Sequence, residues 1–282
     1  MVIAVTGGKG GTGKTTVACA LAMTAARCQF IDCDAEAPNA HLFLKPTIRQ
    51  RQPVSVLRPV VDSHRCTLCG KCAEFCEFNA IAVVADKLLI FHELCHFCGG
   101  CVAICPTGAI QEEPLEIGVV ECGDAAPAIT FVQAKLTVGE QRAGVVIEAA
   151  KRLIDSDQLV IVDAPPGNAG AMIEAVLDAD YCILVTEPTP FGLHDLKMCI
   201  DVIRFLKMPF GVVINRDGIG DERVDRYCES EGITVLLRIP YDERIARSYS
   251  EGIGLLDAMP AMRKHMRELL DTLCGFKGRE VQ

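Results

Sequence analysis

Short apolar runs alternate with longer helical segments along most of the chain. The apolar runs cover residues 1–5, 30–31, 159–162, 181–185, 210–214 and 235–239. Segments rich in Ala and Leu, or with a helical spacing of apolar residues, cover 15–26, 139–154, 193–206 and 222–231. Buried strands that alternate with helices are typical of a parallel sheet with helices on both faces. The sequence therefore predicts an α/β fold with a mostly parallel sheet.

A cysteine-rich segment interrupts this alternation. Residues 53–61 have the composition of a turn-rich linker, the cysteines follow until about residue 110, and the α/β pattern resumes after Gln111. We therefore predict a discontinuous domain, residues 1–61 and 112–282, with a small α+β domain inserted at residues 62–111. The insert is expected to be ferredoxin-like, for reasons given below.

Composition narrows the classes of partner. The formal net charge is −9, which disfavours nonspecific binding to nucleic acid. No apolar run reaches the ~18 residues that a membrane span requires, and the first residues lack the pattern of a signal peptide. We expect a cytoplasmic protein. Eight of its 16 cysteines lie between Cys66 and Cys105, which indicates metal ligation rather than disulfides.

The first predicted strand leads into a glycine-rich phosphate motif. Its residues are Gly8, Lys9, Gly10, Gly11, Thr12, Gly13, Lys14 and Thr15, followed by Thr16. Glycines allow backbone N–H groups to surround phosphate oxygens, and the following helix directs its positive end at the same anions. Lys14 is expected to contact the β- and γ-phosphates, and the Thr15 hydroxyl to bind Mg²⁺. The predicted cofactors are ATP or ADP with Mg²⁺.

Acidic residues end two other predicted strands. Asp163 follows the apolar run at 159–162 and is expected to hold the Mg²⁺ shell through water. Asp32 and Asp34 follow the run at 30–31, and one of them is a candidate to orient the attacking water. A helix cap or a solvated turn is the alternative for this pair.

The second lysine of the phosphate motif, Lys9, is not needed by an ordinary P-loop. With it, the chain resembles the deviant-Walker ATPases, which include the MinD/ParA group and the nitrogenase iron protein. The resemblance covers residues 1–45 and about 115–270. It implies a homodimer with ATP sandwiched between the subunits, in which Lys9 reaches the partner's nucleotide as a catalytic charge.

The same resemblance assigns further residues. Asp32 takes the position of the catalytic aspartate, residues 163–167 that of switch II, Asn215 that of the residue that reads adenine, and Pro240 that of a later loop beside the base. The nitrogenase iron protein uses a cysteine in switch II to bridge its subunits with a cluster. This chain has Pro165 and Pro166 there, so we expect no cluster between subunits.

The cysteines form an internal repeat. The spacing C-x₂-C-x₂-C-x₃-C occurs twice, with the second copy 29 residues after the first, and it is typical of two-cluster bacterial ferredoxins. Because the fourth cysteine of each run completes the other cluster, two crossed ligand sets for two [4Fe–4S] clusters are expected. The first set is Cys66, Cys69, Cys72 and Cys105. The second set is Cys95, Cys98, Cys101 and Cys76.

Alternatives remain at this point. Structural zinc is one, although eight thiolates in this register fit it poorly. His64 and His96 are more typical of surface residues or donors to cluster sulfur than of ligands. The whole layout resembles MinD-superfamily ATPases with an inserted ferredoxin domain. The helical segment at 260–276 has one apolar face, which is typical of a helix packed on the sheet, with a membrane-surface helix as the alternative.

We expect an ATPase that couples its nucleotide state to electron transfer through the two clusters to a redox partner protein. A second hypothesis is a maturation ATPase that supplies clusters to a client metalloprotein. A third is a positioning or partitioning ATPase whose clusters are structural or sense oxygen.

Overall fold

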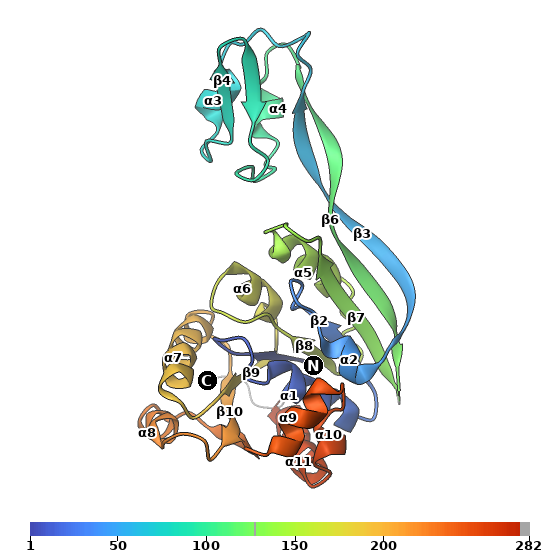
Figure 1. The fold of residues 1–282 in the computed structure, drawn as a ribbon, viewed down its shortest axis with the longest axis vertical. Coiled ribbons are helices and arrows are strands. Elements are labelled where there is room, and N and C mark those ends of the chain that lie inside the picture. Colours follow the sequence, from blue (N-terminus) through green and yellow to red (C-terminus); the bar gives the residue numbers. More distant parts are fainter. Residues whose placement is uncertain (127, 277–282) are drawn as a thin grey trace. The chain divides into compact units, whose positions relative to one another are not determined.

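A computed structural model describes residues 1–126 and 128–276 of the chain. The chain divides into two compact units (Figure 1), of which the first contains Met1–Gln52 and Gly118–Gln282 and the second contains Pro53–Ile117. The insert expected at 62–111 lies within the second unit. The last residues of the predicted ATPase domain, 277–282, lie outside the described part.

A nine-stranded sheet has the order β11-β10-β9-β1-β8-β2-β7-β6-β3. The strands from β11 to β7 pair in parallel, and β6 pairs antiparallel with β7. Their bounds are β1 Val2–Thr6, β2 Cys28–Asp32, β3 Thr47–Val61, β6 Ile110–Ala125, β7 Ile129–Leu136, β8 Val160–Asp163, β9 Tyr181–Thr186, β10 Phe210–Asp217 and β11 Val235–Pro240. The α/β fold with a mostly parallel sheet is therefore confirmed.

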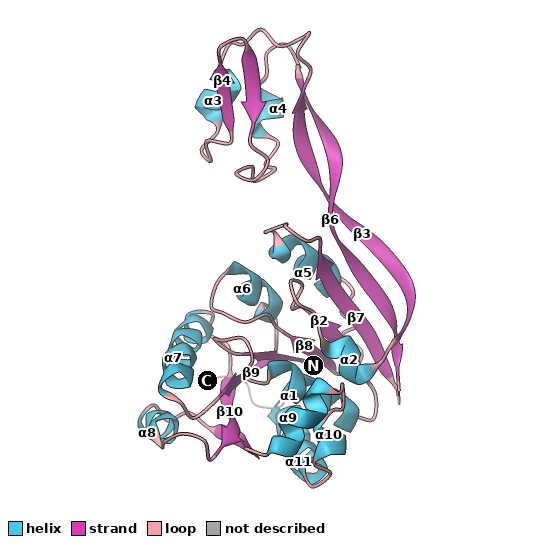
Figure 2. Cartoon of the chain, in the orientation of Figure 1, coloured by secondary structure: helices cyan, strands magenta, loops and turns pink. Residues whose placement is uncertain are grey.

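Helices cover the strands of this sheet (Figure 2). Their bounds are α1 Lys14–Thr24, α2 Ala40–Leu44, α5 Ala143–Lys151, α6 Gly170–Val176, α7 Pro190–Phe205, α8 Arg223–Ser230, α9 Glu243–Ser250, α10 Leu255–Ala258 and α11 Met262–Gly275. The predicted helices at 15–26, 139–154, 193–206 and 222–231 correspond to α1, α5, α7 and α8.

Both faces of the central strands are buried. Ile3 and Val5 on β1 belong to a core cluster with α1, α10 and α11, while Ala4 between them points to the other face and is also fully buried. Strands that are buried on both sides show continuous rather than alternating hydrophobicity. This explains why short apolar runs in the sequence predicted these strands.

The second unit contains two short helices and a small antiparallel pair. Its elements are α3 Lys71–Phe75, β4 Ile81–Val84, β5 Lys87–Ile90 and α4 Gly100–Ile104. Its small core joins Ile81, Leu88 and Ile110 to Cys72 and Cys101. The core of this unit therefore contains cysteines from both halves of the repeat.

The segment 53–61, expected to be a linker, is instead the second half of β3. This strand lies beside β6 at the edge of the sheet. Pro53 and Pro59 had suggested turns, but an edge strand tolerates proline because some of its N–H groups have no ladder partner. Strands β6 and β7 were also missed, because their short apolar stretches, such as Val119-Val120 and Phe131-Val132, lie among polar residues.

The C-terminal helix packs on the sheet domain, as expected. The apolar side chains of α11, which are Met262, Met266, Leu269, Leu270 and Leu273, are at most 5% exposed and join the cluster around α1. This burial leaves no apolar face on α11 for a membrane surface. Across the described residues, no helix is long and apolar enough to cross a membrane.

Replacement of Met266 by Ala tests this packing. Met266 is fully buried, so Met266→Ala should lower the free energy of unfolding by about 2–5 kcal/mol through lost contacts and a cavity. Urea denaturation provides the measurement. Arg267→Ala, at an exposed position of the same helix, is the control and should change stability by less than about 0.5 kcal/mol. Equal effects of the two variants would contradict a docked helix.

Candidate functional site

The glycine-rich motif forms the loop between β1 and α1. Gly13 stands at the N-cap of α1 with φ +98°, and a Cβ atom there would lie 2.2 Å from Nδ2 of Asn215. That amide donates a hydrogen bond of 2.8 Å to the carbonyl oxygen of Thr12. Only glycine fits this conformation and this contact. The strand β10 therefore fixes the path of the loop.

The two lysines of the motif have different surroundings. Lys14 is buried at 6% exposure, and its Nζ donates a 3.1 Å hydrogen bond to the carbonyl oxygen of Lys9. Burial lowers the pKa of Lys14, against the raising influence of Asp163 and Asp34. Lys9 itself is exposed, with its Nζ 5.9 Å from the ring centroid of Phe191. Lys14 thus points into the loop, and Lys9 stands at the surface.

Asp163, at the end of β8, is a buried carboxylate without a partner. It is 1% exposed, and neither of its oxygens accepts a hydrogen bond from the described residues. Burial raises its pKa to about 7, although the nearby Thr15 hydroxyl and Lys14 ammonium oppose this. An unsatisfied buried carboxylate needs an explanation. A water molecule of a Mg²⁺ shell would satisfy it, so this residue fits the predicted cofactor.

Asp32 is also fully buried, at the end of β2, but its oxygens are occupied. They accept hydrogen bonds of 3.1 Å from the backbone N–H groups of Asp34 and Ala40. Burial, followed by the charge of Asp163, raises the pKa of Asp32 well above its usual value. Asp32 thus organises the turn before α2, as the capping alternative expects, and its catalytic role stays a prediction.

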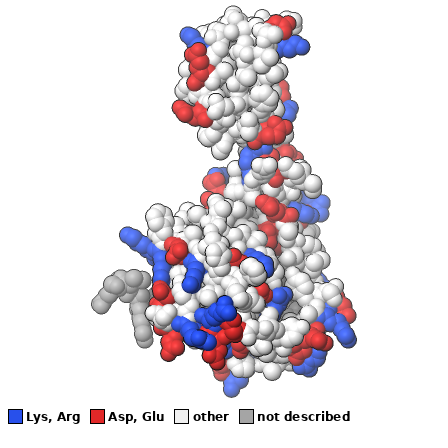
Figure 3. Space-filling model, turned by 60° about the vertical axis from the view of Figure 1, so that its left-hand side comes forward, with Lys and Arg blue, Asp and Glu red and all other residues white. Residues whose placement is uncertain are grey.

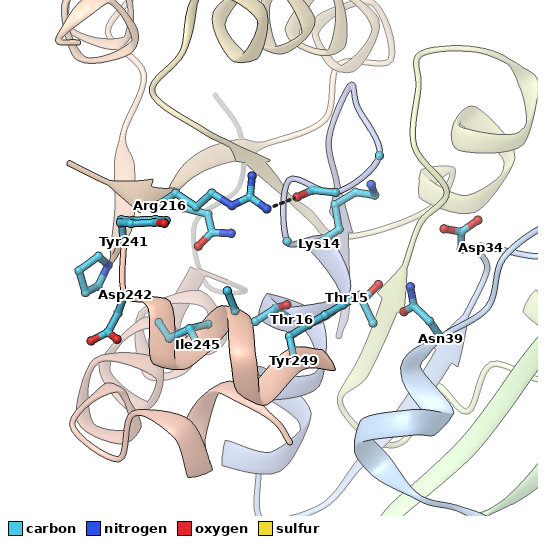
Figure 4. A pocket seen from close by; sticks show the side chains of 16 residues that line it. Lys14, Thr15, Thr16, Asp34, Asn39, Arg216, Tyr241, Asp242, Ile245 and Tyr249 are labelled. Carbon is cyan, nitrogen blue, oxygen red and sulfur yellow. Dashed lines mark hydrogen bonds between the residues drawn. The ribbon is translucent and has the colours of Figure 1, made fainter. Parts of the chain in front are cut away.

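A pocket of about 340 Å³ opens beside the loop (Figure 4). Tyr241 and Asp242 lie on one side of the start of α1, and Asp34 and Asn39 lie on the other. The lining includes these expected residues: Gly10, Gly11, Gly13, Lys14, Thr15, Thr16, Asp34, Asn215 and Pro240. The structure thus brings together residues from four separate segments of the sequence.

Other expected residues lie outside this lining. Gly8, Lys9, Thr12, Asp32 and Asp163 do not belong to it. Asn215, expected to read adenine, lines the pocket while its amide binds the P-loop carbonyl described above. Its role toward a base stays a prediction.

Sequence reasoning missed part of the lining. Arg216 donates a 3.2 Å hydrogen bond to the carbonyl oxygen of Gly11 (Figure 4) and pairs with Glu187 at 2.9 Å. Tyr241, Asp242, Ile245, Ala246 and Tyr249 come from α9 and the turn before it. The short polar helix α9 has no buried residues, so no hydrophobic pattern marked it. Its position directly after Pro240 was the available signal.

The cysteines of the second unit separate into the two expected sets. Cys66, Cys69, Cys72 and Cys105 line one small pocket, together with Pro106 and Thr107. Cys76, Cys95, Cys98 and Cys101 line another, together with Glu74, Glu77 and three phenylalanines. No cysteine is shared between the two linings. The structure therefore groups the fourth cysteine of each run with the first three of the other run.

The two halves of the repeat share an unusual backbone. Leu68 and Phe97 have φ of 54° and 52°, and Gly70 and Gly99 have φ of 77° and 71°. Backbone N–H groups at the matching positions Ala80 and Ala109 donate to the Sγ atoms of Cys76 and Cys105, at 3.4 and 3.3 Å. Loops of this kind direct thiols inward and supply donors to sulfur, which fits iron–sulfur ligation.

The thiols differ in their tendency to ionise. Burial raises the pKa of Cys72, and raises that of Cys101 to about 11. Burial has the same effect on Cys105, but donors from Thr107, Ile110 and Ala109 outweigh it and lower its pKa to about 7. Cys105 is therefore the cysteine of these sets whose thiol is closest to ionisation at neutral pH.

Zinc remains the alternative to clusters, and the two differ in how far apart they place their thiolates. Nowhere in 1–126 or 128–276 do three His, Cys, Asp or Glu side chains form a group that could hold a metal ion. Four thiolates on one zinc ion would lie roughly 3.8 Å apart, given Zn–S distances of about 2.3 Å. Thiolates that each bind a different iron of a larger cluster are spread more widely. His96 stacks on Phe78 with ring centroids 3.7 Å apart.

The parallel sheet, the P-loop and the acidic strand ends define a P-loop nucleotide-binding protein. Residues 3–256 match the CobQ/CobB/MinD/ParA nucleotide-binding domain, and the chain belongs to this family. An uncharacterised protein of Methanocaldococcus jannaschii is 30% identical over 272 residues, which are 91% of each chain. Nucleotide and Mg²⁺ binding are expected of this family.

Other relatives are more distant. The iron-sulfur cluster carrier protein of Pyrococcus horikoshii is 24% identical over 305 residues, covering 98% of this chain and 88% of that protein. The polyferredoxin MvhB of Methanothermobacter thermautotrophicus is 36% identical over 75 residues, 26% of this chain and 17% of that protein. The septum site-determining protein MinD of Pyrococcus horikoshii, solved with Mg-ADP, has a TM-score of 0.56 at 19% identity and covers 98% and 97% of the two chains.

A methyl group at Gly13 should disrupt the loop. Gly13→Ala combines a left-handed backbone, which costs about 1–2 kcal/mol for other residues, with a clash against Asn215. We expect the affinity for ATP to fall at least tenfold, measured by titration with a fluorescent ATP analogue.

Gly139→Ala is the matched control for this prediction. Gly139 has φ +88°, but a Cβ there would have no neighbour within 4 Å. The control should lose similar stability and keep its ATP affinity. An unchanged affinity in Gly13→Ala would mean that the loop does not need its present path.

Proposed function

We propose that this protein is a dimeric, ATP-hydrolysing switch that carries two [4Fe–4S] clusters. Its nucleotide state controls electron transfer between these clusters and a partner protein. The observation that carries the proposal is the presence, in one chain, of a P-loop pocket and of eight cysteines divided four and four between two pockets. A protein that only binds nucleotide has no need of the second feature.

The P-loop residues take their usual roles in this proposal. The loop from Gly8 to Thr16 surrounds the phosphates, Lys14 neutralises the β- and γ-phosphates, and the Thr15 hydroxyl binds Mg²⁺. Asp163 holds a water of the Mg²⁺ shell. Its unpartnered, buried carboxylate supports this role.

Lys9 and Asp32 complete the hydrolytic site across the dimer. The exposed side chain of Lys9 is free to reach a nucleotide on a second copy, whereas the buried side chain of Lys14 is not. Asp32 orients the attacking water or the turn that holds it. Adenine lies on the side of the pocket formed by Asn215 and Pro240, where Tyr241 and Tyr249 add aromatic surface.

The cysteine sets support permanent clusters. Each set draws three ligands from one run and the fourth from the other, so release of a cluster would require both halves of the insert to open. One electron per cluster is the capacity that such sites provide when they are loaded. The exposed aromatic residues Phe75 and Phe78 at the second pocket offer a surface for a partner.

Lys9→Ala tests the dimeric switch. Removal of a charge that acts on the partner's nucleotide should lower ATP turnover at least about a hundredfold, as loss of a trans-acting cation does in related chemistry. ATP binding to the monomer should change less than about threefold, because Lys14 remains. Steady-state hydrolysis measures turnover, titration with a fluorescent ATP analogue measures binding, and light scattering with ATP measures the oligomeric state. Lys197→Ala, an exposed lysine on α7, is the control. Full turnover by a monomeric Lys9→Ala protein would exclude the role in trans.

Coupling is tested by redox titration of protein purified without oxygen. About eight irons per chain are expected for two cubane clusters. Addition of MgATP should then change the reduction potential or the EPR signal of the clusters. Identical spectra with and without nucleotide, in protein that hydrolyses ATP, would refute the coupling. ATP hydrolysis and cluster binding would then stand as two separate activities.

Cluster delivery is the second candidate function. The 24% identical relative named an iron-sulfur cluster carrier protein supports it. If delivery is correct, loaded protein should transfer iron and sulfide to an apo-ferredoxin within minutes, and ATP should change the rate. If electron transfer is correct, the iron should stay with this protein during the same incubation.

A further inference from the structure

The repeat in the second unit makes each cysteine site a reference for the other. Positions 29 residues apart have the same backbone, as the matching φ angles at Leu68 and Phe97 show. Each set also has one buried, one exposed and two half-buried cysteines. The exposure of the ligands to water is therefore matched between the sites. Any difference between the sites must come from the other side chains around them.

Cationic residues accompany the loop of the first set only. Arg65 directly precedes Cys66 and Lys71 directly precedes Cys72, while Leu94 and Gly100 occupy the matching positions of the second loop. Arg65 also donates a 3.0 Å hydrogen bond to the carbonyl oxygen of Thr107, beside Cys105. One acidic residue, Asp62, lies at the start of this loop and accepts from the N–H of His64.

Carboxylates accompany the second set. Glu74 and Glu77 line its pocket, whereas the lining of the first pocket contains no charged side chain. Glu112 lies near the same set, since its Oε1 would be 3.3 Å from a Cβ atom on Gly99. Glu93 lies two residues before Cys95. The position that matches Glu77 in the first site is Pro106, which is uncharged.

Donors to sulfur also differ. The Sγ of Cys105 lies 3.7 Å from the hydroxyl of Thr107 and accepts a hydrogen bond from the N–H of Ala109. In the second site the N–H of Ala80 is preserved, but Phe78 replaces the threonine and has no hydroxyl. The first set thus has one additional donor at its fourth cysteine, while in the second set the N–H of Phe97 donates to the Sγ of Cys95 at 3.4 Å. The donors to sulfur are therefore placed differently in the two sets but do not favour either, and the difference in charge carries the comparison.

We infer that the two cluster sites are redox-inequivalent, and that the set formed by Cys66, Cys69, Cys72 and Cys105 has the higher reduction potential. The inference rests on the proposed function only in requiring that both sites bind a [4Fe–4S] cluster. Reduction adds one negative charge to a site, from the 2+ to the 1+ core, with the electron supplied by a reductant such as dithionite. Nearby cations favour that charge, and nearby carboxylates oppose it.

The order of reduction follows from this difference. The first electron added to the loaded protein should stay at the first set, with the second set oxidised. Arg65 and Thr107 act on this order through the ligands, since Arg65 contacts the backbone beside Cys105 and the Thr107 hydroxyl lies at its Sγ. Glu74 and Glu77 act in the opposite sense at the second set.

The test is an EPR-monitored dithionite titration of the full-length protein loaded with eight irons, without nucleotide. The wild type should show two one-electron waves separated by at least a tenfold difference in equilibrium constant, which is 59 mV. The double variant Arg65→Leu with Thr107→Val should lower the potential of the upper wave, by an amount that corresponds to threefold or more in its equilibrium constant. The double variant Glu74→Gln with Glu77→Gln should raise the potential of the lower wave, again by threefold or more in its equilibrium constant. Leu already occupies the position equivalent to Arg65 in the second half, which favours folding of the first variant.

Asp86→Asn is the control for removal of a carboxylate. Asp86 lies in the turn between β4 and β5 and lines neither pocket, so both waves should stay in place. A single wave for all clusters would overturn the inference, as would an upper wave that moves with the glutamate variants. Failure to bind about eight irons would instead refute the proposed clusters. Because the titration contains no nucleotide, its result is independent of ATP coupling.

Discussion

The ATPase unit depends on a close approach of backbone at the P-loop. A Cβ atom on Gly7 would lie 2.4 Å from the carbonyl oxygen of Val185 on β9, and one on Gly8 would lie 2.5 Å from that of Asp195 on α7. Gly13 is closed by a side chain, since its Cβ would lie 2.2 Å from Nδ2 of Asn215 on β10. Three elements from the second half of the chain therefore hold a loop near its beginning, and they leave no room for side chains. The buried Lys14 and the N–H groups of the loop take their directions from this clamp.

Local sequence signals explain which parts of this site could be predicted. Glycines at the P-loop and apolar runs at β1, β8 and β9 are local signals, so they predicted both the phosphate site and the sheet. Arg216 and the residues of α9 have no such signal. Arg216 contacts the loop only because β10 ends beside it. None of the residues of α9 is buried, so no apolar pattern marks this helix. Contacts made through tertiary structure alone carry no local pattern.

The edge strands illustrate the same limit. Strand β3 contains two prolines and many exposed residues, because an edge strand with one partner does not need a buried face. Its sequence therefore resembles a linker. The grouping of the cysteines, in contrast, follows the spacing of the two runs, since the fourth cysteine of each run lines the pocket of the other. Their role as cluster ligands stays a prediction. The cysteine spacing is a stronger local signal than a sheet edge, because a residue of similar polarity can replace most edge residues but cannot replace a thiolate in the proposed ligation.

The second unit contains two halves with the same cysteine spacing, 29 residues apart. The two halves share the features that the proposed ligation requires: four cysteines, the left-handed residues at Leu68 and Phe97, and the N–H donors at Ala80 and Ala109. They differ where ligation imposes no constraint, at Arg65 and Leu94 or at Thr107 and Phe78. Substitutions that cannot alter the number of ligands can still alter the energy of the charge that the site holds. If both sites bind clusters as proposed, the same backbone with different surrounding charges would make one site hold the first electron. Two identical sites would have no such preference.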